Sequence, residues 1–152
     1  MGFRSVLARP FAAWVARQTR DWSSRPAAVQ EEVRAILVKK ASGTLFGKDH
    51  GFSDIRSHED FKRQVPIRDY EALRNYIDRV LEGNPDILWP GLPAYFSKTS
   101  GTTSGTKYIP ITRDSLPNHI SSARNALLSY IHETGNASFT DGQLIFLSGS
   151  PE

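Results

Sequence analysis

The chain has 152 residues, of which 39% are hydrophobic and 23% charged, so its composition is that of an ordinary soluble globular domain. Its 19 basic residues exceed its 16 acidic ones by three, and this small excess gives no reason to expect a nucleic-acid partner. The lack of cysteine excludes disulfides, zinc–thiolate sites and a cysteine nucleophile, and no apolar run approaches the roughly 18–20 residues that span a membrane. We therefore expect a cytoplasmic protein with neither a membrane nor a nucleic acid as partner.

The N-terminal segment is rich in arginine and contains no acidic residue before Asp21. Such a composition is found in organelle transit peptides. The alternative, which we favour, is a first helix whose apolar side chains pack on the domain. Those side chains are Val6, Leu7, Phe11, Trp14 and Val15.

Apolar residues recur at helical spacing in the segment 26–41, which predicts an amphipathic helix with Pro26 in its first turn. The recurring residues are Val29, Val33, Ile36 and Leu37. Residues 57–60 predict the start of a short helix with acidic side chains near its positive end.

Two further helices are predicted downstream. The first covers residues 69–82, with Asp69 as its N-cap and Gly83 as its C-terminal stop. Its apolar positions are Tyr70, Leu73, Ile77, Val80 and Leu81. A loop rich in proline and glycine follows over residues 84–93. The second helix covers residues 114–134 and places these apolar residues on one face: Ile120, Ala123, Leu127, Leu128 and Ile131.

Strands are predicted at residues 94–97 and 107–112, which are rich in aromatic or β-branched residues, and at the unbroken apolar run 144–147. The order of strand, helix and strand indicates an α/β fold with some parallel pairing, in a chain that is otherwise rich in helix. No internal domain boundary is visible. Because the chain stops five residues after the third run, we expect a truncated domain whose unpaired edge promotes aggregation.

The segment between the first two strands, residues 99–107, has the composition of a phosphate-binding loop. It reads Thr-Ser-Gly-Thr-Thr-Ser-Gly-Thr-Lys, so it holds only hydroxyl side chains, two glycines and one lysine. Glycine lets the backbone approach a ligand closely, hydroxyls and amides donate hydrogen bonds, and a concave run of amides binds anions. A flexible linker would have a similar composition, but the flanking strands indicate a positioned loop. A nucleotide phosphate chain is the ligand we expect.

Two familiar phosphate-binding patterns do not match this segment. Only three residues separate Gly101 from Gly105, and Thr106 stands before Lys107, so the Walker spacing is absent. No Gly-x-Gly-x-x-Gly is present either. The order of residues 99–103, followed three residues later by lysine, instead resembles the first signature of adenylate-forming enzymes, although those usually have glycine and proline where this chain has Ser104 and Thr106.

Three segments resemble one branch of that superfamily, the auxin-responsive Gretchen Hagen family of acyl-acid amido synthetases and their bacterial relatives, and we expect this chain to be one of the bacterial relatives. They are Lys-Tyr-Ile-Pro-Ile-Thr at 107–112, Thr-Leu-Phe-Gly-Lys-Asp-His-Gly-Phe at 44–52, and Phe-Lys-Arg-Gln-Val-Pro-Ile-Arg-Asp-Tyr-Glu at 61–71. The resemblance implies that residues 1–152 are part of the N-terminal, ATP-binding domain, with a helical segment over 1–83. The remainder of the large domain and the C-terminal domain would be absent.

The resemblance also implies a reaction and its participants. A small carboxylic acid is activated by ATP and Mg²⁺ as an acyl-adenylate, and an amino acid or thiol acceptor then takes the acyl group. The resemblance places the phosphate contacts on the loop. Hydroxyl donors would be Ser100, Thr102, Thr103 and Ser104, and the backbone would approach phosphate closely at Gly101 and Gly105. Lys107 would be a phosphate-binding or structural lysine, and Thr99 would anchor the loop to the strand. No catalytic residue and no protein ligand of a metal can be named.

Two other interpretations stay open. The chain could belong to another protein that binds nucleotide phosphates, such as a kinase or a hydrolase, or it could be a non-catalytic fragment that keeps the fold. The four histidines show no paired metal-ligand spacing. His50, which lies between Gly47 and Gly51 in a segment with the family resemblance, is expected to stabilise a turn.

Overall fold

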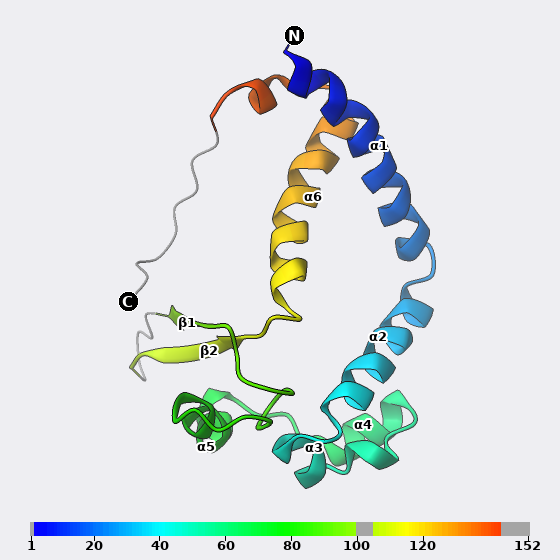
Figure 1. Ribbon diagram of the computed structural model, residues 1–152. Helices are drawn as coiled ribbons and strands as arrows, with labels where there is room; N and C mark the ends of the chain where they lie inside the picture. The colour runs from blue at the N-terminus through cyan, green and yellow to red at the C-terminus, as the bar shows by residue number, and fades with distance from the viewer. Residues whose placement is uncertain (1, 100–104, 144–152) are drawn as a thin grey trace. The chain divides into compact units, whose positions relative to one another are not determined.

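Residues 2–99 and 105–143 are described in the computed structural model, and they are mostly helical with one pair of short strands (Figure 1). The helix-rich fold expected from the sequence is confirmed. The chain divides into two compact units, one formed by residues up to Arg25 together with those from Asn118 onward, and the other by Pro26–Pro117.

The first unit contains the helix α1 (Phe3–Ser23), most of α6 (Leu116–Thr134) and the short 3₁₀ turn η2 (Ser138–Asp141). Its core joins α1 to α6 and the turn after it, through Ala12, Val15, Leu128, Ile131 and Ala137. The first turn of α1 carries no acidic residue of its own, and Asp141, the last residue of η2, places a carboxylate there. Its carboxylate accepts hydrogen bonds from the amides of Gly2 (2.8 Å) and Ser5 (3.2 Å), and these hold the pKa of Asp141 below its usual range.

The helix predicted at the N-terminus exists, but its packing face was predicted wrongly. Of the five apolar residues expected to pack, Val15 alone is buried, and the exposed ones are Val6, Leu7, Phe11 and Trp14. The buried face of α1 consists mainly of small residues, including Ala12 and Ala16, and Ala12 belongs to the core that α1 shares with α6. On α6, Ile120 and Leu127 are likewise exposed, whereas Leu128 and Ile131 are buried.

The second unit begins with a series of helices: α2 (Pro26–Ala41), α3 (Leu45–Asp49), the turn η1 (Phe52–Asp54), α4 (His58–Gln64) and α5 (Tyr70–Leu81). The predicted bounds of α2, the predicted start of α4 and the predicted Asp69 cap of α5 are confirmed, and Ser57 is found to cap α4. The apolar face expected for α2 is wrong, because Val33, Ile36 and Leu37 are exposed. The core of this unit instead uses Val38, Ala41, Phe52 and Ile55.

A long loop connects α5 to the strands and is fastened at two points. The amide of Leu45 donates to the carbonyl of Asp86 (2.8 Å) at the start of α3. Asp114 accepts a hydrogen bond from the indole N–H of Trp89 (2.7 Å) and forms an ion pair with Lys40 (2.8 Å). Both contacts lower the pKa of Asp114, and the contact with Lys40 has the larger effect. The loop therefore ties the end of α2 to the segment that follows the strands.

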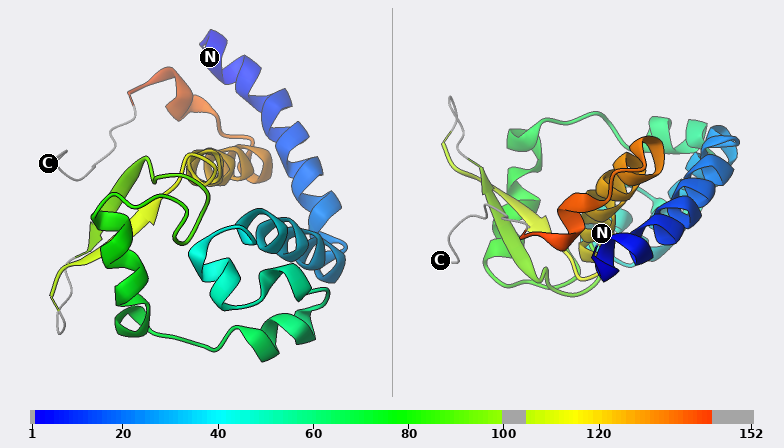
Figure 2. Two further views of the ribbon diagram at one scale, coloured as in Figure 1. Left: turned by 60° about the horizontal axis from the view of Figure 1, so that its bottom comes forward. Right: turned by 90° about the horizontal axis from the view of Figure 1, so that it is seen from above.

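The strands β1 (Tyr95–Thr99) and β2 (Lys107–Ile111) pair antiparallel, with Tyr95 opposite Ile111 and Thr99 opposite Lys107 (Figure 2). Their predicted positions are confirmed, including Lys107 as the first residue of the second strand. The predicted strand at 144–147, and with it the expected parallel pairing, lies outside the described residues. In the described ranges, none of the helices combines the length and the apolar character needed to cross a membrane.

Candidate functional site

The hairpin of β1 and β2 places the two ends of the predicted phosphate loop opposite each other. Thr99 ends β1 and is the register partner of Lys107, which begins β2. Gly105 has a φ of +82°, a left-handed backbone conformation that side chains disfavour, so glycine suits the point where the chain turns back into β2. Gly105 and Thr106 are exposed and Lys107 is half-buried.

Three of the predicted site residues can be placed on this hairpin, namely Thr99, Gly105 and Lys107. Their placement at the strand ends agrees with a loop held between strands, while their contact with phosphate stays a prediction. The remaining predicted residues, Ser100, Gly101, Thr102, Thr103 and Ser104, lie outside the described residues.

Tyr70, the first residue of α5, contacts the hairpin at the start of β2. The phenol oxygen of Tyr70 accepts a hydrogen bond from the backbone amide of Tyr108 at 2.9 Å. The ammonium of Lys107 lies 5.4 Å from the centre of the Tyr70 ring, and the guanidinium of Arg74 lies 6.0 Å from the same ring. A cation over an aromatic face is attracted by the electron density of the ring. The Tyr70 side chain thus holds both the backbone and the charge at the start of β2.

Local contacts at the N-terminus of α5 hold Tyr70 in place. The carboxylate of Asp69 caps the helix by accepting the amide of Ala72 at 2.9 Å. Arg74 forms a bidentate ion pair with Glu71, which raises the pKa of the arginine and keeps the guanidinium on the surface of the helix beside Tyr70. These contacts define the position of Tyr70 relative to the hairpin.

The charge balance at the hairpin suits an anionic ligand. Across the described ranges, no carboxylate forms an ion pair with Lys107, and the lysine ammonium lies over the uncharged ring of Tyr70. An ammonium that has no carboxylate partner among the described residues, close in sequence to Gly105 and Thr106, can attract a phosphate group. Phosphate binding by this hairpin stays a prediction, because most of the predicted donors, Ser100 to Ser104, lie outside the described residues.

Sequence reasoning missed Tyr70 as a residue of the site. The periodicity of residues 69–82 identified it only as one of the apolar positions of a helix. The available signal is the Asp-Tyr-Glu at 69–71, which belongs to one of the segments with the family resemblance but does not by itself indicate a role for Tyr70. The contact with Lys107 joins positions 37 residues apart, and no local pattern reveals it.

The segment around His50 is a turn held together by packed aromatic rings and hydrogen bonds. The ring of His50 is buried, stacks on Phe46 with centroids 4.0 Å apart, and donates from Nδ1 to the Phe46 carbonyl oxygen at 2.8 Å. Gly51 follows with a φ of +57°. Tyr76 closes the cluster by donating to Asp49 at 2.8 Å, and burial raises the pKa of the Tyr76 phenol. The turn-stabilising role expected for His50 agrees with this geometry.

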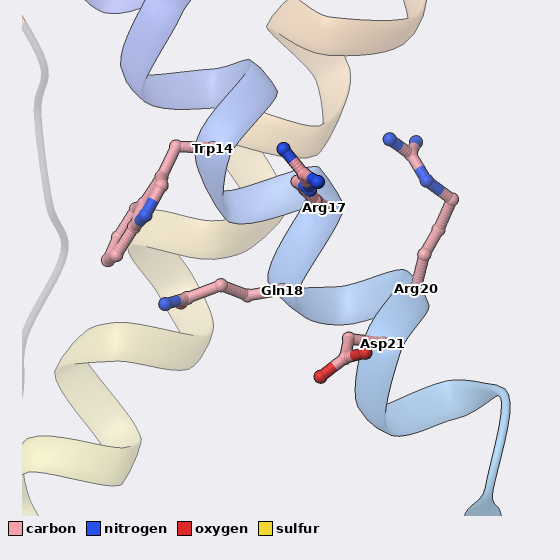
Figure 3. A pocket seen from close by; sticks show the side chains of 5 residues that line it. All are labelled: Trp14, Arg17, Gln18, Arg20 and Asp21. Atoms are coloured by element: carbon pink, nitrogen blue, oxygen red, sulfur yellow. The ribbon is translucent and has the colours of Figure 1, made fainter.

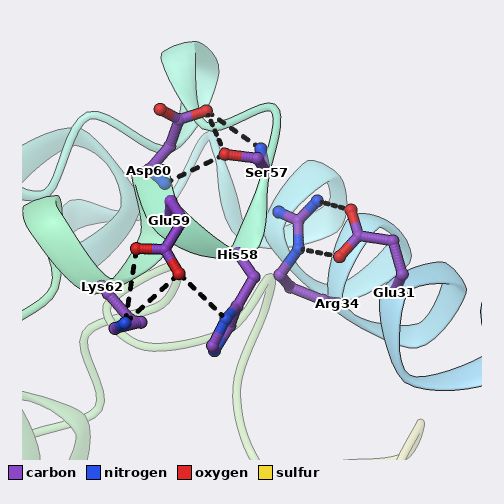
Figure 4. A network of polar contacts seen from close by, with 7 residues as sticks. All are labelled: Glu31, Arg34, Ser57, His58, Glu59, Asp60 and Lys62. Atoms are coloured by element: carbon purple, nitrogen blue, oxygen red, sulfur yellow. Dashed lines mark hydrogen bonds and ion pairs between the residues drawn. The ribbon is translucent and has the colours of Figure 1, made fainter. Parts of the chain in front are cut away.

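A surface network of charged residues surrounds the start of α4 (Figure 4). Ser57 and Asp60 form a reciprocal capping box, in which each side chain accepts an amide of the other residue. The hydrogen bonds from the Ser57 side chain and from the amide of Arg56 lower the pKa of Asp60 to about 2. Nearby, Arg34 pairs with Glu31 and donates to the carbonyl of Arg56 at 2.9 Å. Of these contacts, the one from Arg34 to the carbonyl of Arg56 joins α2 to the segment before α4.

Two hollows lie away from the hairpin residues. One, of about 520 Å³, is lined by consecutive turns of α1 alone, through Trp14, Arg17, Gln18, Arg20 and Asp21 (Figure 3). The other, of about 450 Å³, is apolar, and its walls come from α2, α3, α4, α5 and the loop after α5. Neither includes Thr99, Gly105 or Lys107 among its lining residues, so neither forms part of the site built on the hairpin.

Comparison with known proteins identifies related sequences over most of the chain. Residues 15–150 match the GH3 family N-terminal domain. The indole-3-acetic acid-amido synthetase GH3.15 of Arabidopsis thaliana is 41% identical over 120 residues, which cover 76% of this chain and 20% of that protein. The jasmonoyl–L-amino acid synthetase JAR4 of Nicotiana attenuata is 28% identical over 88 residues, covering 57% of this chain and 15% of that protein.

A solved structure shares the fold. The GH3.15 acyl acid amido synthetase superposes with a TM-score of 0.70 at 24% identity, over 77% of this chain and 21% of that one. The chain thus spans about a fifth of the length of these relatives. The relatives named here are plant proteins, and a bacterial source stays a prediction.

Proposed function

The chain belongs to the GH3 family, and we propose that it supplies the phosphate-binding loop of an acyl acid amido synthetase. The observation that carries this proposal is the hairpin, which brings Thr99 opposite Lys107 and leaves the lysine ammonium without a carboxylate partner among the described residues. Further support comes from the names of two relatives, one an indole-3-acetic acid-amido synthetase and the other a jasmonoyl–amino acid synthetase. ATP, a small carboxylic acid and an amino acid are the substrates that we infer.

In the first step of the proposed reaction, a carboxylate oxygen of the acid attacks the α-phosphorus of ATP. A new oxygen–phosphorus bond forms, the bond between the α-phosphorus and the bridging oxygen breaks, and pyrophosphate leaves. An anion must approach a polyanion, so the barrier falls when positive groups offset the phosphate charge. Lys107 and the loop that it closes would provide positive charge and hydrogen-bond donors. A Mg²⁺ ion bound to the nucleotide would add further positive charge.

In the second step, the amino group of the acceptor attacks the acyl carbon of the adenylate. The carbon–nitrogen bond forms, the carbon–oxygen bond to AMP breaks, and the nitrogen loses a proton. Activation is needed because a free carboxylate would have to expel an oxide ion, whereas AMP is a stable leaving group. A thiol acceptor would react by the same route, and it is the alternative that we retain for the acceptor.

The described residues provide the phosphate end of this reaction only. We assign the acid, the acceptor and the adenine to no residue of the chain. A kinase or a hydrolase with an unusual loop is the competing proposal, and it differs in a product that can be measured. Kinases and most nucleotide hydrolases release ADP, while adenylation releases AMP and pyrophosphate.

The experiment is an assay of the full-length gene product with MgATP, an amino acid mixture and a panel of small carboxylic acids headed by indole-3-acetic and jasmonic acid. We expect AMP and an acyl–amino acid conjugate in equal amounts, detected by liquid chromatography and mass spectrometry. Both products should disappear when either the acid or the amino acid is omitted. ADP as the nucleotide product, or AMP formation independent of every acid, would contradict the proposal.

A further inference from the structure

We infer that Tyr70 is a positioning residue for nucleotide phosphate, acting through Lys107 and the backbone at the start of β2. This inference rests on the proposed function, because it concerns the same loop. The role belongs to a residue on α5, outside the loop that carries the hydroxyls and glycines.

The first part of the argument is the backbone contact. Tyr108 pairs with Lys98 in the register of the hairpin, and its amide donates to the Tyr70 hydroxyl at 2.9 Å. A hydrogen bond from the second residue of a strand to a helix side chain fixes the distance between that strand and the helix. Since Lys107 directly precedes Tyr108, the same bond fixes the backbone from which the lysine side chain leaves.

The second part is the contact of the ring with the lysine. The Lys107 ammonium lies 5.4 Å from the ring centre of Tyr70 and, within the described residues, has no carboxylate partner. The aromatic face holds a cation at a defined place without neutralising it, whereas a carboxylate in the same position would compete with phosphate for the charge. A lysine held by a ring has no ion pair to break and loses less freedom when a phosphate group arrives.

The third part is the rigidity of the support. Tyr70 is the first residue of α5, and the residue before it caps the helix, with the Asp69 carboxylate accepting the amide of Ala72 at 2.9 Å. Arg74, one turn further along, also contacts the ring of Tyr70 and is held in turn by Glu71. The ring therefore sits on a defined helical turn, which a positioning residue requires.

The test measures the affinity of the full-length gene product for MgATP by isothermal titration calorimetry. Tyr70→Phe removes the hydroxyl and keeps the ring, and Tyr70→Leu removes both. Tyr76→Phe is the matched control, because it removes a hydroxyl from the same helix with a hydrogen bond of similar length, 2.8 Å, to Asp49. Thermal unfolding of each variant is recorded alongside.

We expect Tyr70→Phe to weaken MgATP binding by roughly 3- to 10-fold, which is the effect of one lost hydrogen bond. Tyr70→Leu should weaken it further, and Tyr76→Phe should leave it unchanged even if it lowers the melting temperature. If Tyr70→Leu fails to fold, Tyr70→Phe and its control still decide the question. Equal affinities for the Tyr70→Phe and Tyr76→Phe variants would overturn the inference.

A double-mutant cycle with Lys107→Ala separates positioning from a general loss of stability. When the lysine is absent, Tyr70→Phe should change the affinity for MgATP by less than about 2-fold, because coupled residues have non-additive effects. Additive losses would contradict the inference while leaving the proposed function intact. If the unsubstituted protein does not bind MgATP at all, the proposed function itself fails, and the inference fails with it.

Discussion

Gly47 shows at the scale of a single residue how the family-like segment determines the local structure. The glycine is buried in α3, and a β-carbon built on it would collide with the backbone carbonyl oxygen of Ala41. The backbone of α2 therefore approaches α3 more closely here than it could if a residue with a β-carbon stood at position 47. Gly43, four residues earlier, has no atom within 4 Å of the corresponding position.

We predict that Gly47→Ala lowers the free energy of unfolding by about 1–3 kcal/mol, since overpacking against backbone cannot be relieved by a side-chain rotation. Gly43→Ala is the control and should cost far less. Urea denaturation followed by circular dichroism compares the two variants. Equal stabilities would show that α2 and α3 do not approach each other as closely as described.

Thr44 gives a second prediction at this scale. Its buried hydroxyl accepts the amide of Gly47 at 3.0 Å and donates to the carbonyl of Ala41 at 2.7 Å, so it caps α3 and joins it to the end of α2. Thr44→Ala should destabilise the protein by about 1–2 kcal/mol, because a cap and a buried hydrogen bond are lost together. Thr44→Ser keeps the hydroxyl and should recover most of the loss in the same denaturation experiment. A serine variant as unstable as the alanine variant would argue against the capping role.

Asp60 makes a prediction about pH. Hydrogen bonds from Ser57 and the amide of Arg56, with Arg63 adding to them, lower its pKa to about 2 in the folded protein, below the value of about 3.9 for an unfolded chain. A lowered carboxyl pKa stabilises the folded state above the unfolded value, and this contribution disappears as the pH falls from about 4 to about 2.

The pH dependence is isolated by comparison with Asp60→Asn, because other carboxyl groups titrate in the same range. Above about pH 5 the difference in unfolding free energy between the two proteins should be constant, and it should shrink toward pH 2, where Asp60 becomes protonated. Denaturant titrations at several pH values measure this difference. A difference that does not change with pH would mean that the capping box does not lower the pKa of Asp60.

At the scale of elements, helix ends were easier to predict than helix faces. Caps depend on neighbouring residues, so Asp69 and Gly83 marked the two ends of α5 directly from the sequence, and the glycine has a φ of +86° in the structure. Faces depend on what the helix packs against. The apolar stripe of α1 led to the wrong face, because the partner helix α6 meets small residues such as Ala12.

Helix α6 allows a test of which of its faces forms the core. Ile131 is buried against α1, whereas Ile120, on the same helix, is 67% exposed. Ile131→Ala should cost about 2–4 kcal/mol through lost burial and a cavity, and Ile120→Ala less than about 0.5 kcal/mol. Thermal unfolding of both variants measures the contrast. A reversed order would show that the core of the first unit had been assigned to the wrong side of α6.

At the scale of the whole chain, the sequence predicts where the phosphate loop lies but not how the hairpin that carries it is supported. The glycines, hydroxyls and lysine of residues 99–107 lie together in the sequence, and the strands on either side were predicted from β-prone residues. The contact of Tyr70 with Lys107 and Tyr108 depends instead on how α5 packs beside β2. Packing between elements distant in sequence leaves no local pattern, so only the fold could reveal it.

The most direct measurement is acid-dependent exchange of labelled pyrophosphate into ATP by the full-length gene product, carried out with the unsubstituted protein, Lys107→Ala and a control, Lys62→Ala. Lys62 pairs with Glu59 on α4 and takes no part in the hairpin. We predict exchange that requires a carboxylic acid but no amino acid, a fall of at least about 10-fold in Lys107→Ala, as expected for a lost charge-assisted contact, and no change in Lys62→Ala. Exchange that is absent with every acid, or equally fast in the two lysine variants, would contradict the assignment of this hairpin to nucleotide activation.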